Sequence, residues 1–116
     1  MKIIHFYTTE DRKCPVTDFL DTLSGKQVQK VAWVLQLIEE LEVIPTSYFK
    51  KLINTAEIWE IRIQSAGNTF RLLGFLDGNN LIVLNHAFQK KTQKTPKKEI
   101  KIAEKRRKDY LLRRKS

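Results

Sequence analysis

The chain has 116 residues, of which 41% are hydrophobic, and a formal net charge of +9 at pH 7. This length predicts one domain that spans residues 1–116. A single cysteine, Cys14, excludes an intrachain disulfide and a cysteine-based metal site, as is usual in a reducing compartment. No apolar run approaches the roughly 18 residues of a membrane span, and the N-terminal run is too short for a signal peptide. We therefore expect a soluble cytoplasmic protein without a metal or other cofactor.

The positive charge is unevenly distributed along the chain. Residues 1–49 contain five Lys or Arg and seven Asp or Glu, whereas residues 89–116 contain thirteen and three. Such an asymmetry is typical of a chain that contacts nucleic acid or an acidic protein partner.

The N-terminal third predicts one strand and two helices. Ile3 to Tyr7 is a β-branched and aromatic run, which favours a strand. Pro15 suits the first position of a short helix. Ser24 and Gln27 form a capping-box pattern that opens a second, longer helix, which we expect to end at Pro45. Two helices that form a hairpin are therefore expected.

The middle of the chain changes to a two-residue period. In "EIWEIRIQ", Trp59, Ile61 and Ile63 alternate with polar residues, which predicts a half-buried strand. "TFRLLGFL" and "LIVLNHAF" predict two more strands, separated by the turn sequences "SAGN" and "DGNN". These three strands should form an antiparallel meander with the last strand central and the N-terminal strand at an edge. Gly74, inside a strand, indicates a bulge or a close backbone approach.

The C-terminal segment predicts a basic helix over about residues 96–114. Thr95 is its expected N-cap and Pro96 lies in its first turn. The complete order is β-α-α-β-β-β-α. This order predicts an α+β fold in which the three helices pack on one face of a small antiparallel sheet.

Cations on strands are the first candidate functional residues. Arg62 and Arg71 flank the "SAGN" turn on adjacent strands and can be close neighbours across them. Two interpretations have equal weight. The arginines share a bound anion, or Glu60 forms a structural salt bridge with them on a solvated face. A lone histidine on a strand, such as His5 or His86, is more often a hydrogen-bonded structural residue than a catalytic one.

Three runs carry a resemblance to a known family. "WEIRI", "FRLL" and "FQKKTQKTP" occur in this order, and together they resemble the RelE/ParE toxin superfamily. The similarity is greatest to its HigB-like branch, which includes phage-derived toxins. The resemblance implies a RelE-like fold and the toxin of a type II toxin–antitoxin system, a ribosome-dependent mRNA endoribonuclease that inhibits translation. It also implies a HigA-like antitoxin with a helix-turn-helix domain, through which alone the toxin would reach operator DNA.

The implied reaction requires no metal. The 2′-hydroxyl attacks the adjacent phosphate while a base removes its proton, cations stabilise the phosphorane and an acid protonates the leaving oxygen. Crowded cations lower the pKa of a lysine, since each disfavours charge on its neighbour. By resemblance, Arg71 takes the phosphate-stabilising position and Arg62 the position of a catalytic lysine. Lys90 and Lys91 match the basic position after the last strand.

The chain also departs from the family pattern. Glu60 stands where the RelE prototype has another lysine, and no tyrosine follows the last strand near the start of the C-terminal helix. The assignment of acid and base therefore stays open, with His86 and Lys94 as candidates for a vacant role. The remaining expected contacts with the RNA backbone come from Lys50, Lys51, Lys97 and Lys98.

Two other functions are compatible with the sequence. One is a ParE-like inhibitor of DNA gyrase, and the other is a non-catalytic nucleic-acid-binding module. The lysines that directly follow the last strand favour RNA cleavage, because a pure binder needs no cations that converge on a sheet face.

Overall fold

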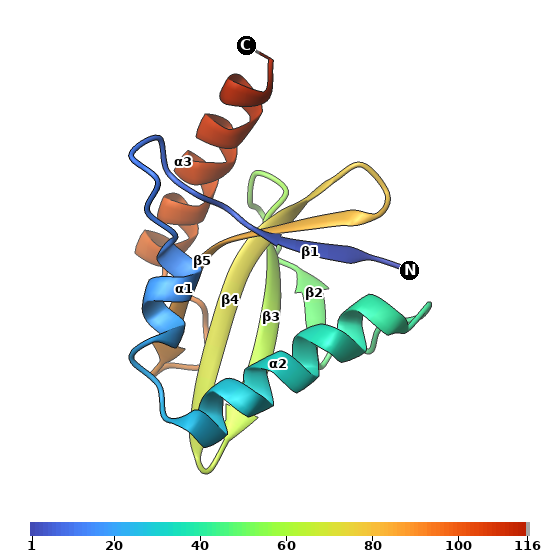
Figure 1. Ribbon diagram of the computed structural model, residues 1–116, viewed down its shortest axis with the longest axis vertical. Coiled ribbons are helices and arrows are strands. Elements are labelled where there is room, and N and C mark those ends of the chain that lie inside the picture. Colours follow the sequence, from blue (N-terminus) through green and yellow to red (C-terminus); the bar gives the residue numbers. More distant parts are fainter. Residues whose placement is uncertain (116) are drawn as a thin grey trace.

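The computed structural model describes residues 1–115 and contains a five-stranded sheet with three helices (Figure 1). This arrangement confirms the predicted α+β class. No helix within the described residues is long and apolar enough to cross a membrane. The elements in chain order are β1 (Ile3–Phe6), α1 (Pro15–Leu20), α2 (Gly25–Glu40), β2 (Phe49–Lys51), β3 (Trp59–Ser65), β4 (Asn68–Asp77), β5 (Leu81–Lys90) and α3 (Lys97–Arg114).

The strands lie in the order β1-β5-β4-β3-β2. The predicted meander of β3, β4 and β5 is confirmed, and β1 lies at an edge beside β5 as expected. The sheet is not wholly antiparallel, however, because β1 runs parallel to β5. A parallel pair requires a long connection between its strands, and here the rest of the chain from α1 to β4 provides it.

The short strand β2 is missing from the predicted order. It pairs antiparallel with β3, so that Phe49 lies opposite Ile61 and Lys50 lies opposite Glu60. Three residues with two exposed lysines show no repeated alternation. Sequence periodicity therefore has no signal for this strand, which extends the sheet beyond the meander.

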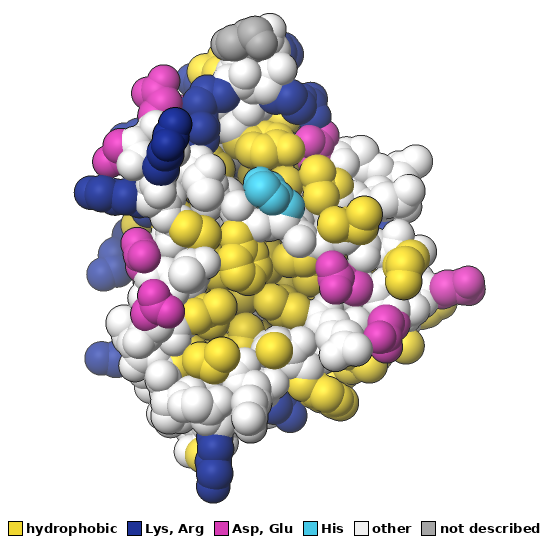
Figure 2. Space-filling view, in the orientation of Figure 1, with side chains coloured by type: hydrophobic (Ala, Val, Ile, Leu, Met, Phe, Trp, Pro, Cys, Tyr) yellow, Lys and Arg dark blue, Asp and Glu magenta, His cyan; other side chains and the backbone are white. Residues whose placement is uncertain are grey.

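The helices cover both faces of the sheet, and the prediction that all three pack on one face is wrong. Alternation along β4 shows this directly. Phe70 and Leu72 join the core that contains Val34 of α2, whereas Leu73 packs with Ala103 of α3. Figure 1 shows α1 and α2 in front of the sheet. Figure 2 shows that hydrophobic side chains gather in the middle of this front face, while most Lys and Arg lie near its outline.

Helix starts follow their capping signals in one case and not in another. The Ser24 capping box of α2 is confirmed, since Gln27 N donates to Ser24 Oγ at 3.3 Å and Ser24 N donates to the Gln27 side chain at 2.9 Å. The helix ends at Glu40, before Pro45.

At the start of α3, Pro96 is the N-cap residue and no side chain caps the helix. The expected cap, Thr95, instead donates its hydroxyl to Glu60 on β3. This contact ties the segment before α3 to the sheet.

A β-bulge anchors α3 to the sheet. Leu73 pairs with His86 but Gly74 pairs with Leu84, which leaves Asn85 as the extra residue. Its side chain donates to the carbonyl of Ala103 at 2.9 Å. A Cβ on Gly74 would lie 2.0 Å from the carbonyl oxygen of Val83. The bulge and the close backbone approach predicted at Gly74 are therefore both confirmed.

Candidate functional site

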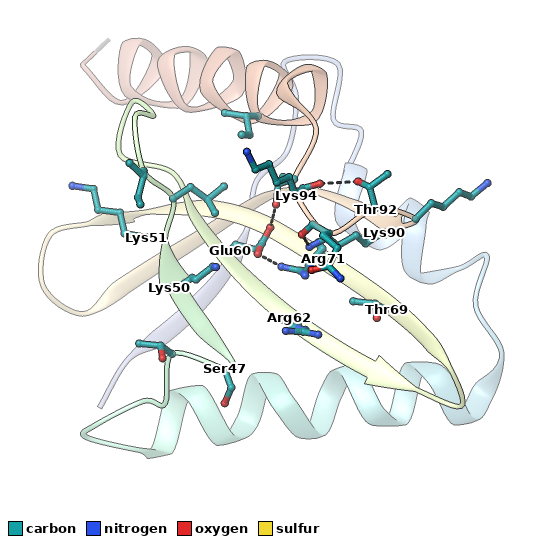
Figure 3. Close-up of a pocket in the computed structure, with 17 residues that line it drawn as sticks. Ser47, Lys50, Lys51, Glu60, Arg62, Thr69, Arg71, Lys90, Thr92 and Lys94 are labelled. Carbon is teal, nitrogen blue, oxygen red and sulfur yellow. Dashed lines mark hydrogen bonds and ion pairs between the residues drawn. The ribbon is translucent and has the colours of Figure 1, made fainter.

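A basic cavity of about 1040 Å³ lies on the face of the sheet that carries α3, beside the first turn of that helix (Figure 3). Its wall comes from β2 to β5, the loops around β2 and the connection between β5 and α3. The lining contains one carboxylate, Glu60, and seven cationic side chains: Lys50, Lys51, Arg62, Arg71, Lys90, Lys91 and Lys94. Seven cations around one carboxylate favour an anionic ligand.

The strand register explains why these side chains meet. Arg62 lies directly opposite Arg71 across the β3–β4 pair, and Lys50 lies opposite Glu60 across β2–β3. Ile61 and Ile63, between these polar positions, are buried in the core on the other face. A two-residue period thus directs the apolar half of β3 to the core and the charged half to the cavity.

Arg71 and Glu60 form an ion pair that is almost completely buried. Arg71 Nη1 donates to Glu60 Oε1, and the side chains are 6% and 1% exposed. Thr95 donates to the other carboxylate oxygen, Glu60 Oε2. The salt bridge weighed from the sequence is therefore present, but it lies at the base of a cavity and not on a solvated face.

The ion pair does not use all the donors of the Arg71 guanidinium. Among the described residues, Arg71 Nε is one of three buried side-chain atoms that lack a hydrogen-bond partner. A buried donor without a partner costs free energy, and a bound anion would satisfy it. Burial lowers the pKa of Arg71, Glu60 opposes that change, and the neighbouring Arg62 lowers the pKa further.

Lys90 is the half-buried lysine of the cavity lining, whereas Lys50, Lys51, Lys91 and Lys94 are exposed. Its Nζ donates to the backbone carbonyl of Gln93. Burial lowers the pKa of Lys90, and the charges of Arg71, Arg62 and Lys50 add to this effect against the attraction of Glu60. A lysine with a lowered pKa has more of the neutral amine that can accept a proton.

Lys91 and Lys94 line the cavity from the connection between β5 and α3, and both side chains are exposed. The bond from Lys90 to Gln93 shapes this connection, as does a hydrogen bond of 2.8 Å from the Thr92 hydroxyl to the carbonyl of Lys94. On the wall that β2 forms, Lys51 pairs with Glu57 at 2.9 Å. Lys50 lines the same wall, so both lysines share the cavity with the predicted catalytic residues.

The structure does not bring three of the predicted residues into the cavity lining. Lys97 and Lys98 are exposed in the first turn of α3. His86 lies beneath α3, where Nε2 is 3.1 Å from Glu99 Oε1 and Nδ1 is 3.2 Å from Arg106 Nη1. Burial lowers the pKa of His86 although Glu99 raises it. This geometry suits a neutral ring that accepts from Arg106 and donates to Glu99, which is a structural role.

Sequence reasoning missed Thr95 as a residue of the site. Thr95 followed by Pro96 is a helix-opening signal, which assigns the Thr95 hydroxyl to the cap of α3. The long-range contact of this hydroxyl with Glu60 was therefore not predicted. Thr46 and Ser47, which line the wall before β2, carried no sequence signal either. Within residues 1–115, no group of three or more His, Cys, Asp or Glu side chains could hold a metal ion.

Comparisons with known proteins place the chain in a family. No curated protein matches the sequence. Residues 18–108 match the family model described as phage-derived protein Gp49-like (DUF891). This match covers most of the chain, including the second helix, the meander and the cavity-lining connection before α3. The chain therefore belongs to the Gp49-like phage-derived family, a family of RelE/Gp49-type toxins.

Proposed function

We propose that the protein is the toxin of a type II toxin–antitoxin system and cleaves messenger RNA on the ribosome, which stops translation. The observation that carries this proposal is the buried Arg71, which has an unsatisfied Nε at the base of a cavity lined by seven cations. The phosphorane of RNA cleavage is an anion that such a site would stabilise. Membership in the Gp49-like family supports a toxin with a cognate antitoxin.

The proposed reaction uses the RNA 2′-hydroxyl as the nucleophile. Lys90 accepts the hydroxyl proton, and the O2′–P bond forms as the P–O5′ bond breaks. Arg71 and Arg62 stabilise the charge that develops on the phosphate oxygens. Lys91 or Lys94 donates a proton to the leaving O5′. The products are a 2′,3′-cyclic phosphate and a 5′-hydroxyl end, so protons and bonds balance without a further reactant.

The proposed partner is an acidic antitoxin with a HigA-like helix-turn-helix domain. Exposed lysines of α3, including Lys101, Lys105 and Lys108, would attract it. Two arginines at the end of α3 are less available, because Arg113 pairs with Asp109 at 2.8 Å and Arg114 pairs with Asp77. These two pairs fasten the helix, so we assign the partner contact to the lysines.

Expression without a partner tests the proposal against gyrase inhibition. If the protein cleaves messenger RNA, uptake of labelled amino acid into protein should fall within minutes, before uptake of labelled thymidine into DNA. An early fall of DNA synthesis with intact protein synthesis would instead support a ParE-like inhibitor of gyrase. A fall of neither would leave the non-catalytic binding module as the better interpretation.

A further inference from the structure

One wall of the basic cavity is apolar. Its side chains are Leu52 and Ile53, which follow β2, and Ile100 in the first turn of α3. Ile53 is 87% exposed, which makes it one of the most exposed large hydrophobic residues of the chain. Together with Leu52 and Ile100 it gives the charged cavity one apolar side, and burial of this apolar surface against a ligand would be favourable.

The loop that carries Ile53 is held by hydrogen bonds on its inner side. Leu52 N donates to the carbonyl of Ile58 at 2.8 Å. The Thr55 hydroxyl donates to the carbonyl of Leu52 at 2.9 Å and accepts from Ile58 N at 3.2 Å. Leu52 and Ile58 also pack in the core beneath α3. The chain on both sides of Ile53 is therefore fixed to the body of the domain.

The outer side of the loop is also tied down. Ala56 N donates to the Glu104 side chain on α3 at 2.7 Å, and Lys51 forms an ion pair with Glu57 at 2.9 Å. Asn54, the next residue after Ile53, has φ +59°, the left-handed conformation of a tight turn. These contacts hold the Ile53 side chain outward at the edge of the cavity, so its exposure is a built feature of the loop.

We infer that Leu52, Ile53 and Ile100 form a subsite for a nucleobase next to the phosphodiester that Arg71 and Lys90 bind. The inference rests on the proposed function, since it names the part of the RNA that this wall would cover. A nucleotide joins an anion to a flat base whose faces are apolar, and this cavity joins a cationic floor to an apolar wall. A protein segment could also cover Ile53, but the unsatisfied Arg71 Nε at the floor favours a ligand with a phosphate.

The side chains of this wall have no hydrogen-bond donors or acceptors, which determines the selectivity of the subsite. Packing against aliphatic groups depends on buried area and not on the pattern of base edges. The subsite should therefore accept every base, bind purines more tightly than pyrimidines, and bind an abasic nucleotide most weakly.

A binding titration of the full chain tests the inference without cleavage or ribosomes. The probes are a 2′-deoxy trinucleotide of adenines, which lacks the attacking hydroxyl, and the same molecule with an abasic central residue. Chemical-shift changes in NMR spectra report the dissociation constants. Wild-type protein should bind the base-bearing probe about fivefold or more tightly than the abasic one. Ile53→Ser should reduce this preference to about twofold or less without changing affinity for the abasic probe.

Two variants control the titration. Val43 is 85% exposed and does not line the cavity, so Val43→Ser should keep the wild-type preference. Arg71→Gln should weaken the binding of both probes to the same extent, because both probes carry the phosphates. Circular dichroism melts show whether each variant is folded.

The outcomes separate the two proposals. If Arg71→Gln weakens both probes but wild-type protein binds them equally, the base subsite is wrong and the phosphodiester site stands; Ile53 would then be a contact for a protein partner. Retention of the base preference by Ile53→Ser would also overturn the subsite. If Arg71→Gln leaves the affinities for both probes unchanged, the phosphodiester site of the proposed function is wrong, and the base subsite defined beside it is wrong too.

Discussion

Arg71 and Glu60 form a buried ion pair at the base of the cavity, and Glu60 also accepts a hydrogen bond from Thr95. One carboxylate therefore holds the guanidinium and the segment that precedes α3. Because Lys91 and Lys94 lie on that same segment, the position of the lysines depends on the ion pair. The pair thus joins two parts of the site that are far apart in the sequence.

Glu60→Gln should destabilise the fold strongly. The substitution keeps the shape of the side chain but leaves the Arg71 charge buried without its partner, which typically lowers the free energy of unfolding by about 3–5 kcal/mol. Phosphate ions should restore part of the loss, since an anion bound to the native state stabilises it by mass action. Urea unfolding with and without phosphate measures both effects.

Glu57→Gln is the matched control for this prediction. Glu57 also pairs with a cation of the cavity wall, Lys51, but its side chain is 61% exposed. This variant should change the stability little and should show no additional response to phosphate. Equal unfolding midpoints for Glu60→Gln and Glu57→Gln would show that the buried pair does not stabilise the fold.

Lys90 should determine the pH dependence of cleavage. Since burial and the neighbouring arginine charges lower its pKa below the ordinary lysine value of 10.5, the neutral amine becomes available at lower pH. The single-turnover rate should rise with pH and reach a plateau above the lowered pKa. Lys90→Arg keeps the charge but cannot lose its proton, so the rising limb should disappear.

Lys97→Arg is the control for Lys90, because Lys97 is exposed on α3 and does not line the cavity. It should keep the wild-type pH profile. If Lys90→Arg also keeps that profile, another group accepts the proton.

His86, which lies between α3 and the sheet, should make the stability of the fold depend on pH. Its pKa in the folded protein is lowered from 6.5 by burial, so near that pH the unfolded chain binds more protons than the folded one. Stability should therefore fall as the pH drops from about 6.5 through the lowered pKa, and stay low below it. The groups that contact the ring are the Glu99 carboxylate on one side and the Arg106 guanidinium on the other.

Melting temperatures from pH 8 to pH 5 measure this dependence. His86→Gln should flatten the slope near pH 6, whereas His5→Gln should leave it unchanged because His5 is exposed. An unaltered slope in His86→Gln would assign the pH dependence to other groups.

Gly74→Ala should disrupt the sheet at the bulge. The new Cβ would lie 2.0 Å from the carbonyl oxygen of Val83, a backbone atom that cannot move without breaking the β4–β5 pairing. We expect a loss of about 3 kcal/mol or more in the free energy of unfolding. Gly25→Ala, which meets no atom within 4 Å, should be tolerated in a parallel denaturation experiment. Similar stabilities of the two variants would contradict the close approach at Gly74.

Local patterns predicted much of the fold. The alternation of Trp59, Ile61 and Ile63 and the "DGNN" turn were sufficient for the meander, which places Arg62 opposite Arg71. The side of the sheet on which α3 packs was not predictable in this way. It depends on Leu73 and Phe88, which face Ala103 only because β4 and β5 are buried on both faces. A strand that is apolar at nearly every position does not show which helix covers which face.

The site was predicted less completely than the fold. The cations that line the cavity were found because they cluster on strands and directly after β5. The roles of Thr95 and Ile53 depend on contacts between distant segments. Thr95 reaches Glu60 across 35 residues, and Ile53 lies beside the cavity only because its loop is tied to α3. The spacing of residues within one segment cannot predict contacts between distant segments.

Single-turnover cleavage of messenger RNA on saturating ribosomes is the most direct test of the central claim that Arg71 stabilises the transition state. The comparison is wild-type protein against Arg71→Gln, at a temperature at which circular dichroism shows that both are folded, with ribosome binding measured in parallel. We predict that the Arg71→Gln protein cleaves on the order of 10²–10³-fold more slowly than wild type, while its affinity for the ribosome changes little. Cleavage at the wild-type rate by an Arg71→Gln protein that melts at a much lower temperature would contradict the claim. Arg71 would then be only the structural partner of Glu60.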